Sequence, residues 1–366
     1  MDSITRAAGD LLGVELSDPV DLGGSRRSTV VRCRTADGGS VIVKAFTGAP
    51  DSLRAFTAEA AGLSLGLAGP EVLGVDPEFP LLVMADLGAV PTLVDVLLGD
   101  DPAAAEDGLL AWAGGLGRLA AASVGRRADF ERQWARYDMG RPSWEEEPWT
   151  VQNIAALPGV LGQAGVPAPA GLVEELTGIG TAGGHEYPAF TPGDTCLDNN
   201  LLTPEGLRLI DFEAACFQSV FLTAAYCRMP FSSCWCVFTL PAGTAAAIEG
   251  AYRAEVATVY PALARDAVWQ AGVRQAVAVW TLDATVRLLS RAIRDDAPLH
   301  PTRRPAPTVR QLLRHRWETA ADLTEFPAFA RTVRSLLSEV AGGWEVAPLP
   351  RYPAFHDGRT GRTGEG

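Results

Sequence analysis

The chain contains 366 residues with a formal net charge of −13, and 47% of the residues are hydrophobic. At roughly 150 residues per domain, this length predicts about two domains or lobes. The acidic balance argues against non-specific nucleic-acid binding, which needs clustered basic side chains. The sequence contains no uninterrupted apolar stretch of about 18 residues, so no transmembrane helix is predicted. Residues 1–18 also lack the apolar core of a signal peptide. We therefore expect a globular, cytoplasmic protein with no nucleic-acid or membrane partner.

Two segments near the N-terminus predict a β-hairpin. Residues 28–35 (STVVRCRT) and 40–46 (SVIVKAF) are rich in β-branched side chains, and residues 37–39 (DGG) form a turn signal between them. The preceding residues 23–28 (GGSRRS) combine glycines with small hydroxyl side chains, Ser25 among them. Such a loop lets backbone N–H groups approach a phosphate, although a simple turn explains the pattern equally well.

A lysine in the second strand and a glutamate on the following segment are predicted to pair. Lys44 stands among apolar residues, so it requires either a solvent-facing edge or a partner. Residues 51–68 predict a helix, because leucine and phenylalanine recur at helical spacing. Glu59 projects from near the apolar face of that helix and also requires a partner. Lys44 is the evident candidate.

The remainder of the chain predicts mainly helical structure. A short apolar strand is predicted at 80–84, and helices are predicted at 103–123, 243–260, 265–295 and 308–340. Residues 158–171 predict a surface connection, residues 216–236 a buried helix followed by an irregular segment, and residues 347–366 a loose tail. Asp283 and Arg287 lie four residues apart, which predicts a pair within one helix.

An aromatic residue and a run of acids lie in a predicted loop at 141–150. Trp144 precedes three glutamates at 145–147. Aromatic faces and carboxylates attract ammonium groups, so this loop is a candidate cation pocket. A solvated loop is the preferred interpretation.

The cysteines predict no disulfide framework. The sequence contains six of them, namely Cys33, Cys196, Cys216, Cys227, Cys234 and Cys236. Disulfide-rich secreted scaffolds are usually much shorter than this chain. Cys234 and Cys236 are separated by one residue, which is not the spacing of common zinc sites. Because five cysteines fall between residues 196 and 236, a metal site is an alternative, but free thiols are the preferred interpretation.

The stretch 190–215 (FTPGDTCLDNNLLTPEGLRLIDFEAA) places two acids and an amide in one small region. Asp194 follows a Pro-Gly turn, and Asn199 comes five residues later in the same loop. Residues 200–212 predict a hairpin with a Pro-Glu-Gly turn. Because a hairpin returns to its starting point, Asp211 at its end is expected to lie beside the loop that carries Asp194 and Asn199.

These three side chains suit a magnesium-nucleotide enzyme. Magnesium takes oxygen ligands, usually one or two carboxylates together with substrate phosphates. Asn199 and Asp211 are the natural pair of metal ligands. Asp194 is then left to orient an attacking hydroxyl group and to accept its proton.

The pattern D-x4-N at 194–199 followed by I-D-F-E at 210–213 resembles the catalytic and metal-binding loops of the aminoglycoside phosphotransferase and choline kinase superfamily. The acid Glu213 matches the choline-kinase-like branch, where protein kinases carry a glycine. One position departs from the pattern. The family's histidine before the catalytic Gly-Asp is Pro192 here, and proline supplies no hydrogen-bond donor.

The resemblance covers most of the chain, from about residue 20 to 340, and implies an α+β, two-lobed, protein-kinase-like fold. Residues 1–87 would form a nucleotide-binding lobe with an antiparallel β-sheet and one helix. Residues 88–346 would form a mainly α-helical lobe for catalysis and acceptor binding.

The resemblance also implies roles in nucleotide binding. Lys44, oriented by Glu59, would hold the phosphates beneath the loop that contains Ser25. The strand at 80–84 would lead into the hinge between the lobes. Met84 would lie at the back of the adenine pocket, with the backbones of Ala85 and Leu87 facing the base.

The implied reaction is magnesium-dependent transfer of the γ-phosphoryl group of ATP, or of GTP, to a hydroxyl of a small molecule such as an aminoglycoside or an amino alcohol. One alternative is a kinase of serine or threonine in a peptide during natural-product biosynthesis. Another is a nucleotide-binding pseudokinase or scaffold. Pro192 favours the last interpretation, and the intact set of Lys44, Asp194, Asn199 and Asp211 opposes it.

Overall fold

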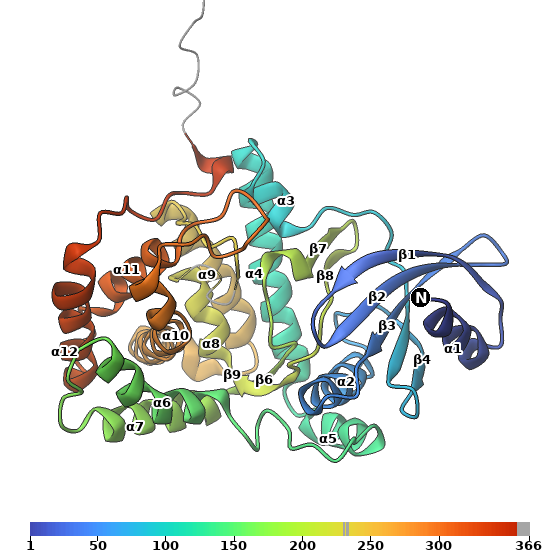
Figure 1. Cartoon of the computed structure of the whole chain (residues 1–366), viewed down its shortest axis with the longest axis horizontal. Helices are drawn as coiled ribbons and strands as arrows, with labels where there is room; N and C mark the ends of the chain where they lie inside the picture. The colour runs from blue at the N-terminus through green and yellow to red at the C-terminus, as the bar shows by residue number, and fades with distance from the viewer. Residues whose placement is uncertain (230, 232–233, 357–366) are drawn as a thin grey trace, which may run out of the picture.

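The computed structural model of the chain describes residues 1–229, 231 and 234–356, without the side chains of 181–185. The chain forms two lobes, a smaller one built around a sheet and a larger helical one (Figure 1). The smaller lobe contains α1 (Asp2–Leu12), β1 (Leu16–Gly24), β2 (Ser28–Thr35), β3 (Ser40–Phe46), α2 (Pro50–Leu63), β4 (Val72–Asp76) and β5 (Leu81–Ala85).

The larger lobe is mainly helical, with short strands at its border with the sheet lobe. Its helices are α3 (Leu93–Leu97), α4 (Pro102–Ser123), α5 (Arg127–Arg136), α6 (Trp149–Gln163), α7 (Leu172–His185), α8 (Val220–Ala224), α9 (Ala242–Ala257), α10 (Asp266–Arg294), α11 (Val309–Ala320) and α12 (Pro327–Ser335). Its strands are β6 (Pro188–Thr191), β7 (Asn200–Thr203), β8 (Gly206–Leu209) and β9 (Cys216–Ser219). None of the described helices is both long and apolar enough to cross a membrane. The sheet lobe and the helical lobe together confirm the predicted α+β, two-lobed architecture.

The five strands of the sheet lobe run in the order β1-β2-β3-β5-β4, with every neighbouring pair antiparallel. The predicted hairpin forms at the predicted residues, and its register pairs Val30 with Lys44. Helix α1 and strands β1 and β4 were not predicted from the sequence. Helix α1 packs through Ala8 against the face of the sheet that carries Val31, Val43 and Val83. The sheet lobe thus contains two helices where one was expected.

Helix α4 is the central helix of the larger lobe. Its predicted apolar face is buried, with Trp112 1% exposed and Leu116 3% exposed. It packs against α9 and reaches both β6 and the β7–β8 hairpin. Helix α4 therefore supports the β7–β8 hairpin.

Several segments differ from their predicted structure, among them residues 308–340, which form the two helices α11 and α12 where one was expected. Helix α6 continues through Pro158 to Gln163, although a surface connection was expected from residue 158 onward. Leu157 and Leu161, on either side of the proline, are buried and keep this part of the chain packed as a helix. Residues 216–219 form β9 and not the start of a helix, because they pair with β6. That partner strand lies almost thirty residues upstream, which local periodicity cannot reveal.

Part of the segment predicted as a loose tail is packed against the larger lobe. Tyr352 is fully buried, and Leu349 is 7% exposed. Thr239 donates its N–H to the carbonyl oxygen of Pro350 at 2.8 Å. Residues 357–366 of the predicted tail lie outside the described residues.

Candidate active site

The predicted β-hairpin forms and brings Asn199 and Asp211 together. Strand β7 pairs with β8 in antiparallel register, with Asn200 opposite Leu209. One residue further, the N–H of Ile210 donates to the carbonyl oxygen of Asn199 at 3.0 Å. Asp211 then takes a left-handed backbone conformation with φ 67°, which aspartate tolerates better than most residues. This bend at Asp211 ends the hairpin and directs the following residues towards the candidate site.

The turn before Asp194 requires glycine. Gly193 has φ 91°, and a Cβ atom there would lie 2.3 Å from the carbonyl oxygen of Ala214. The Asp194 Oδ1 atom accepts a hydrogen bond from the N–H of Cys196 at 3.0 Å. Asn199 Nδ2 donates to the Asp194 carbonyl oxygen at 3.3 Å. Backbone and amide groups of the loop itself therefore contribute to holding it.

Lys44 lies at the centre of a buried cluster of carboxylates. Its Nζ atom is 2.5 Å from Glu59 Oε2, 2.8 Å from Asp211 Oδ1 and 3.4 Å from Glu213 Oε1. Lys44 is 5% exposed and Glu59 is 1% exposed. The predicted pairing of Lys44 with Glu59 is thus present, and the same lysine joins the sheet lobe to Asp211 at the end of the β7–β8 hairpin.

The cluster shifts the ionisation of its members. Burial by itself would lower the pKa of Lys44, but the neighbouring carboxylates raise it, so the ammonium form persists. Burial raises the pKa of Glu59 to about 7, against the opposing effect of Lys44. Burial also raises the pKa of Glu213. The pKa of Asp211 is lowered, because the effect of Lys44 outweighs the effect of burial.

The charges of this cluster fit a divalent cation. Arg27 Nε lies 2.8 Å from Glu213 Oε2, so the carboxylates of Glu59, Asp211 and Glu213 face two cationic side chains, Arg27 and Lys44. When all three carboxylates are ionised, the cluster carries one net negative charge. With the amide oxygen of Asn199 next to the hairpin, the donor set consists of oxygen atoms, which magnesium prefers. The residues present therefore fit the predicted ion.

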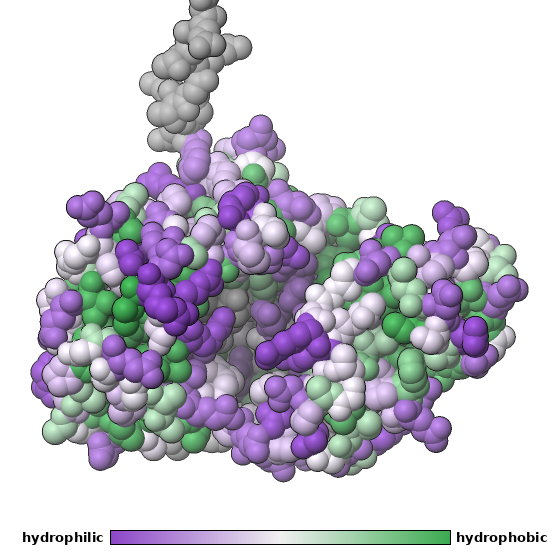
Figure 2. All heavy atoms as spheres, viewed as in Figure 1, coloured by the Kyte–Doolittle hydropathy of each residue, from purple (hydrophilic) through white to green (hydrophobic). Residues whose placement is uncertain are grey.

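A cavity of about 470 Å³ opens between the lobes beside this cluster. Figure 2 shows the hollow on this face, with hydrophilic residues around its rim. Every residue predicted to bind nucleotide or metal lines this cavity, namely Ser25, Lys44, Glu59, Met84, Ala85, Leu87, Asn199 and Asp211. Asp194 does not line it. Asp198 and Arg303, neither of which was predicted from the sequence, also line it and form an ion pair with each other.

One backbone group of the predicted hinge already has a hydrogen-bond partner. The N–H of Ala85 donates to the carbonyl oxygen of Glu71 at 2.9 Å, so this group is already engaged within the sheet lobe. Leu87 lies beyond the last paired residue of β5. Of the two hinge residues, Leu87 is therefore the better placed to offer its N–H to a ligand.

A second cavity, of about 590 Å³, contains Asp194 in its wall. Trp149 and Trp280 line it as a stacked pair with ring centroids 5.0 Å apart. Asp283 also lines it and accepts hydrogen bonds from Asn153 Nδ2 at 3.0 Å and from Arg287, its predicted helical partner, at 3.1 Å. The two cavities meet at an ion pair, because Arg27 lines the second cavity and Glu213 the first.

The loop around Trp144 belongs to this second cavity. Trp144 Nε1 donates to the carbonyl oxygen of Glu213 at 3.2 Å, and Glu145 Oε1 accepts from the N–H of Phe217 at 2.8 Å. Both residues line the cavity beside Asp194. The preferred interpretation as a solvated loop is therefore wrong for these two residues. Their partners lie about 70 residues away, so no local pattern could identify them.

The expectation of six free thiols is also wrong. Cys196 and Cys234 form a disulfide, whereas Cys33, Cys216, Cys227 and Cys236 are free. The two bonded residues are 38 positions apart and come together through tertiary packing. Spacing along the chain carries no signal for this pairing.

Comparison of the sequence with family models and with curated proteins found no match. Comparison with solved structures found similar proteins. A candidate fructosamine-3-kinase from Thermobifida fusca YX-ER1 is 20% identical, with 91% of this chain and 99% of that chain covered and a TM-score of 0.48. A macrolide 2′-phosphotransferase from Brachybacterium faecium is 18% identical, with 80% and 93% covered and a TM-score of 0.47. A choline/ethanolamine kinase family protein from Mesorhizobium loti is 18% identical, with 87% and 92% covered and a TM-score of 0.46.

Proposed function

We propose that this protein is a magnesium-dependent phosphotransferase that moves the γ-phosphoryl group of ATP or GTP to a hydroxyl of a small molecule. The observation that carries the proposal is the arrangement of two adjoining cavities. Lys44, Asn199 and Asp211 line one, whereas Asp194 lines the other. A donor site for nucleotide and an acceptor site for a hydroxyl group thus meet at the catalytic loop.

Each predicted residue has a role that follows from its surroundings. Lys44 remains charged and would hold the nucleotide phosphates, with Glu59 fixing its direction. Asn199 and Asp211 would hold magnesium, which neutralises charge on phosphate oxygens. Asp194, anchored by the N–H of Cys196, would orient the acceptor hydroxyl and take its proton. Catalysis of this kind depends mainly on placement and charge neutralisation.

The second cavity supports a small-molecule acceptor. Its volume of about 590 Å³ lies within the range of roughly 300–1,000 Å³ found for small-ligand pockets. Trp149, Trp280 and Asp283 provide aromatic faces and a carboxylate, which suit an acceptor with an ammonium group, such as an aminoglycoside or an amino alcohol. We retain the peptide kinase as an alternative that the acceptor screen below would detect.

Calorimetric binding of ATP and GTP, with and without magnesium, tests the donor site. We expect wild type to bind nucleotide in a magnesium-dependent manner and Asp211→Ala to lose that dependence. Glu205→Ala is the matched control, because it removes an exposed acid from the turn of the same hairpin. No binding by wild type in any condition would refute the proposal and favour a scaffold role.

Transfer of labelled phosphate into pools of metabolites and peptides tests the acceptor site. We expect Asp194→Ala to keep nucleotide binding and to lower transfer by on the order of 100-fold or more, since a positioned base contributes roughly 100- to 10,000-fold. Near-normal transfer by Asp194→Ala would show that its assigned role is wrong.

A further inference from the structure

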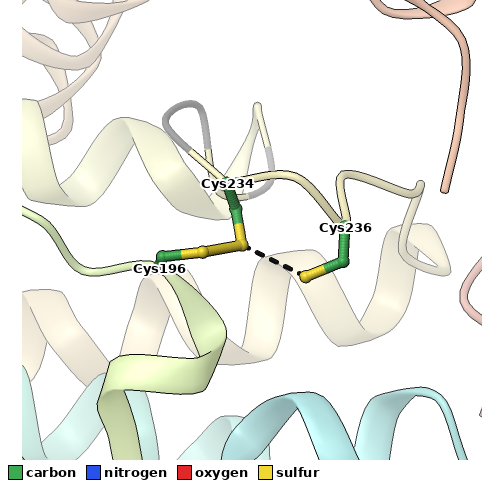
Figure 3. Close-up of side chains that lie close together, drawn as sticks. All are labelled: Cys196, Cys234 and Cys236. Atoms are coloured by element: carbon green, nitrogen blue, oxygen red, sulfur yellow. Dashed lines mark hydrogen bonds between the residues drawn. A yellow bond between two sulfur atoms is a disulfide. The ribbon is translucent and has the colours of Figure 1, made fainter. Parts of the chain in front are cut away.

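Three buried sulfur atoms lie together next to the catalytic loop (Figure 3). Cys196 is bonded to Cys234, and Cys236 Sγ lies 3.1 Å from Cys234 Sγ. Because the Cys234 sulfur carries no proton, the Cys236 thiol is the donor in this contact. All three residues are buried, with exposed fractions of 6%, 5% and 0% for Cys196, Cys234 and Cys236.

One end of the disulfide belongs to the loop that holds Asp194. The N–H of Cys196 donates to Asp194 Oδ1 at 3.0 Å. The carbonyl oxygen of Cys196 accepts from the N–H of Asn199 at 2.9 Å and from Asn200 Nδ2 at 2.6 Å. The peptide groups of Cys196 therefore connect the carboxylate of Asp194 to the start of the hairpin. Any displacement of Cys196 moves the group that orients this carboxylate.

The other end belongs to a segment that contacts the loop at Asp198 and is also anchored outside the loop, by Tyr352. The hydroxyl of Tyr352, which is fully buried, donates to the carbonyl oxygen of Cys236 at 2.8 Å. Trp235 Nε1 donates to Asp198 Oδ2 at 3.2 Å, so the same segment also reaches the nucleotide cavity. The disulfide thus ties the catalytic loop to a part of the larger lobe that its own contacts hold in place.

We propose that the Cys196–Cys234 disulfide positions Asp194, so that phosphoryl transfer by this protein depends on the redox state of this bond. This inference rests on the role proposed for Asp194. A dithiol reductant would supply two electrons and two protons, the S–S bond would break into two thiols, and the reductant would close its own disulfide. The loop would then lose a constraint that Pro192 cannot replace, because proline donates no hydrogen bond.

The same three sulfurs could bind a metal ion only in a different state of the protein. Their ligand atoms lie within 4.8 Å of one another, but no fourth histidine, cysteine, aspartate or glutamate joins them among the described side chains, those of residues 1–180, 186–229, 231 and 234–356. A metal would require all three cysteines as thiolates. The bond between two of them, together with the protonated third, favours the disulfide. Cys236 separates the two cases, because a metal site needs it and the disulfide does not.

Activity measurements test the positioning role, with slow hydrolysis of Mg-ATP as the assay in which water replaces the acceptor. We expect dithiothreitol to lower kcat by roughly 10- to 100-fold, as a misplaced catalytic group does, with the KM for ATP unchanged and with recovery on reoxidation. Cys196→Ser and Cys234→Ser should show the low kcat and no response to dithiothreitol. Cys236→Ser, the matched control, should behave as wild type. Equal kcat in reduced and oxidised wild type would overturn the proposal.

A second readout separates this inference from the proposed function. In the oxidised full-length protein, peptide mapping should recover Cys196 linked to Cys234 and Cys236 alkylated. Reduction should speed hydrogen exchange at residues 195–200 while the far-ultraviolet circular dichroism stays unchanged. If no preparation hydrolyses ATP, hydrogen exchange alone decides whether the bond constrains the loop. Three alkylated cysteines, or one zinc ion per chain that is lost equally in all three cysteine variants, would overturn the proposal.

Discussion

At the scale of single residues, the site depends on backbone positions as much as on charged side chains. Gly193 is the clearest case, because its conformation is left-handed and the carbonyl oxygen of Ala214 occupies the place of a Cβ atom. A side chain there would push the catalytic loop away from the segment that follows Asp211. The position of Asp194 is thus set by the absence of a side chain on its neighbour.

We expect Gly193→Ala to destabilise the protein by about 2–4 kcal/mol, combining the cost of a left-handed alanine with that of overpacking. Urea denaturation measures this change. Gly250→Ala is the control, because Gly250 lies within helix α9 and a methyl group added to it would meet no atom within 4 Å. This control should stabilise the protein by about 0.5–1 kcal/mol. Similar stability of Gly193→Ala and wild type would contradict the close approach to Ala214.

His315 provides a prediction for the dependence of stability on pH. Burial, followed by the effect of Arg316, lowers the pKa of His315 to about 4. The unfolded chain binds this proton near pH 6.5 and the folded chain near pH 4. The stabilisation is therefore present above about pH 6.5 and is lost as the pH falls towards 4.

When the pH is lowered from about 7.5 to about 5, the free energy of unfolding should fall in both proteins. We expect the fall to be about 1–2 kcal/mol smaller in His315→Gln than in wild type. Urea denaturation at the two pH values gives the comparison. An equal loss in both proteins would show that another group causes the acid sensitivity.

At the scale of elements, helix α4 supports the hairpin that carries the site. It begins with Asp101 as its N-cap, whose Oδ1 atom accepts from the N–H groups of Ala103 at 2.9 Å and Ala104 at 3.1 Å. Pro102 follows at the first helical position, which needs no donor. The start of the helix is therefore encoded locally, whereas its contacts with the hairpin come from tertiary packing.

We expect Asp101→Ala to lower the free energy of unfolding by about 1 kcal/mol, the usual value of an N-cap. Asp100→Ala is the matched control, because it removes the same charge one residue earlier, outside the N-cap position. The difference between the two midpoints in urea measures the cap. Equal effects would mean that charge near the helix start, and not the hydrogen bonds, matters.

At the scale of the whole molecule, the two lobes meet around Lys44. The ion pair between Lys44 on β3 and Asp211 after β8 spans the border at 2.8 Å, and the cavity proposed to bind nucleotide is lined by residues of both lobes. A ligand that binds there should stabilise both lobes together, since it binds the folded chain and not the unfolded one.

We expect saturating Mg-ATP, at about 100 times its Kd, to stabilise wild type by about 2.7 kcal/mol. Lys44→Met should lose most of this increment, because the phosphates lose their cation. Trp149→Ala should keep it, because Trp149 lines the second cavity and not the first. Thermal unfolding with and without Mg-ATP measures the increment. An equal increment in Lys44→Met would refute the role of Lys44 in the donor site.

The sequence by itself determined the elements whose signals are local. The β2–β3 hairpin, the β7–β8 hairpin and the helix that carries Glu59 follow from short-range alternation, turn residues and helical spacing. The proximity of Asn199 and Asp211 was predictable because a hairpin returns to its start. The pairing of Lys44 with Glu59 was predictable because a buried charge without a partner of opposite sign is energetically unfavourable.

Only the tertiary structure decided the features that join distant segments. The β6–β9 pair, the Cys196–Cys234 disulfide and the contact of Arg27 with Glu213 each connect residues far apart in the chain. The second cavity likewise assembles Trp144, Asp194 and Trp280 from separate elements. Local patterns record the preferences of neighbouring residues, whereas these contacts depend on how whole elements pack. The sequence therefore indicates the chemistry of the site, and the fold places its two cavities side by side.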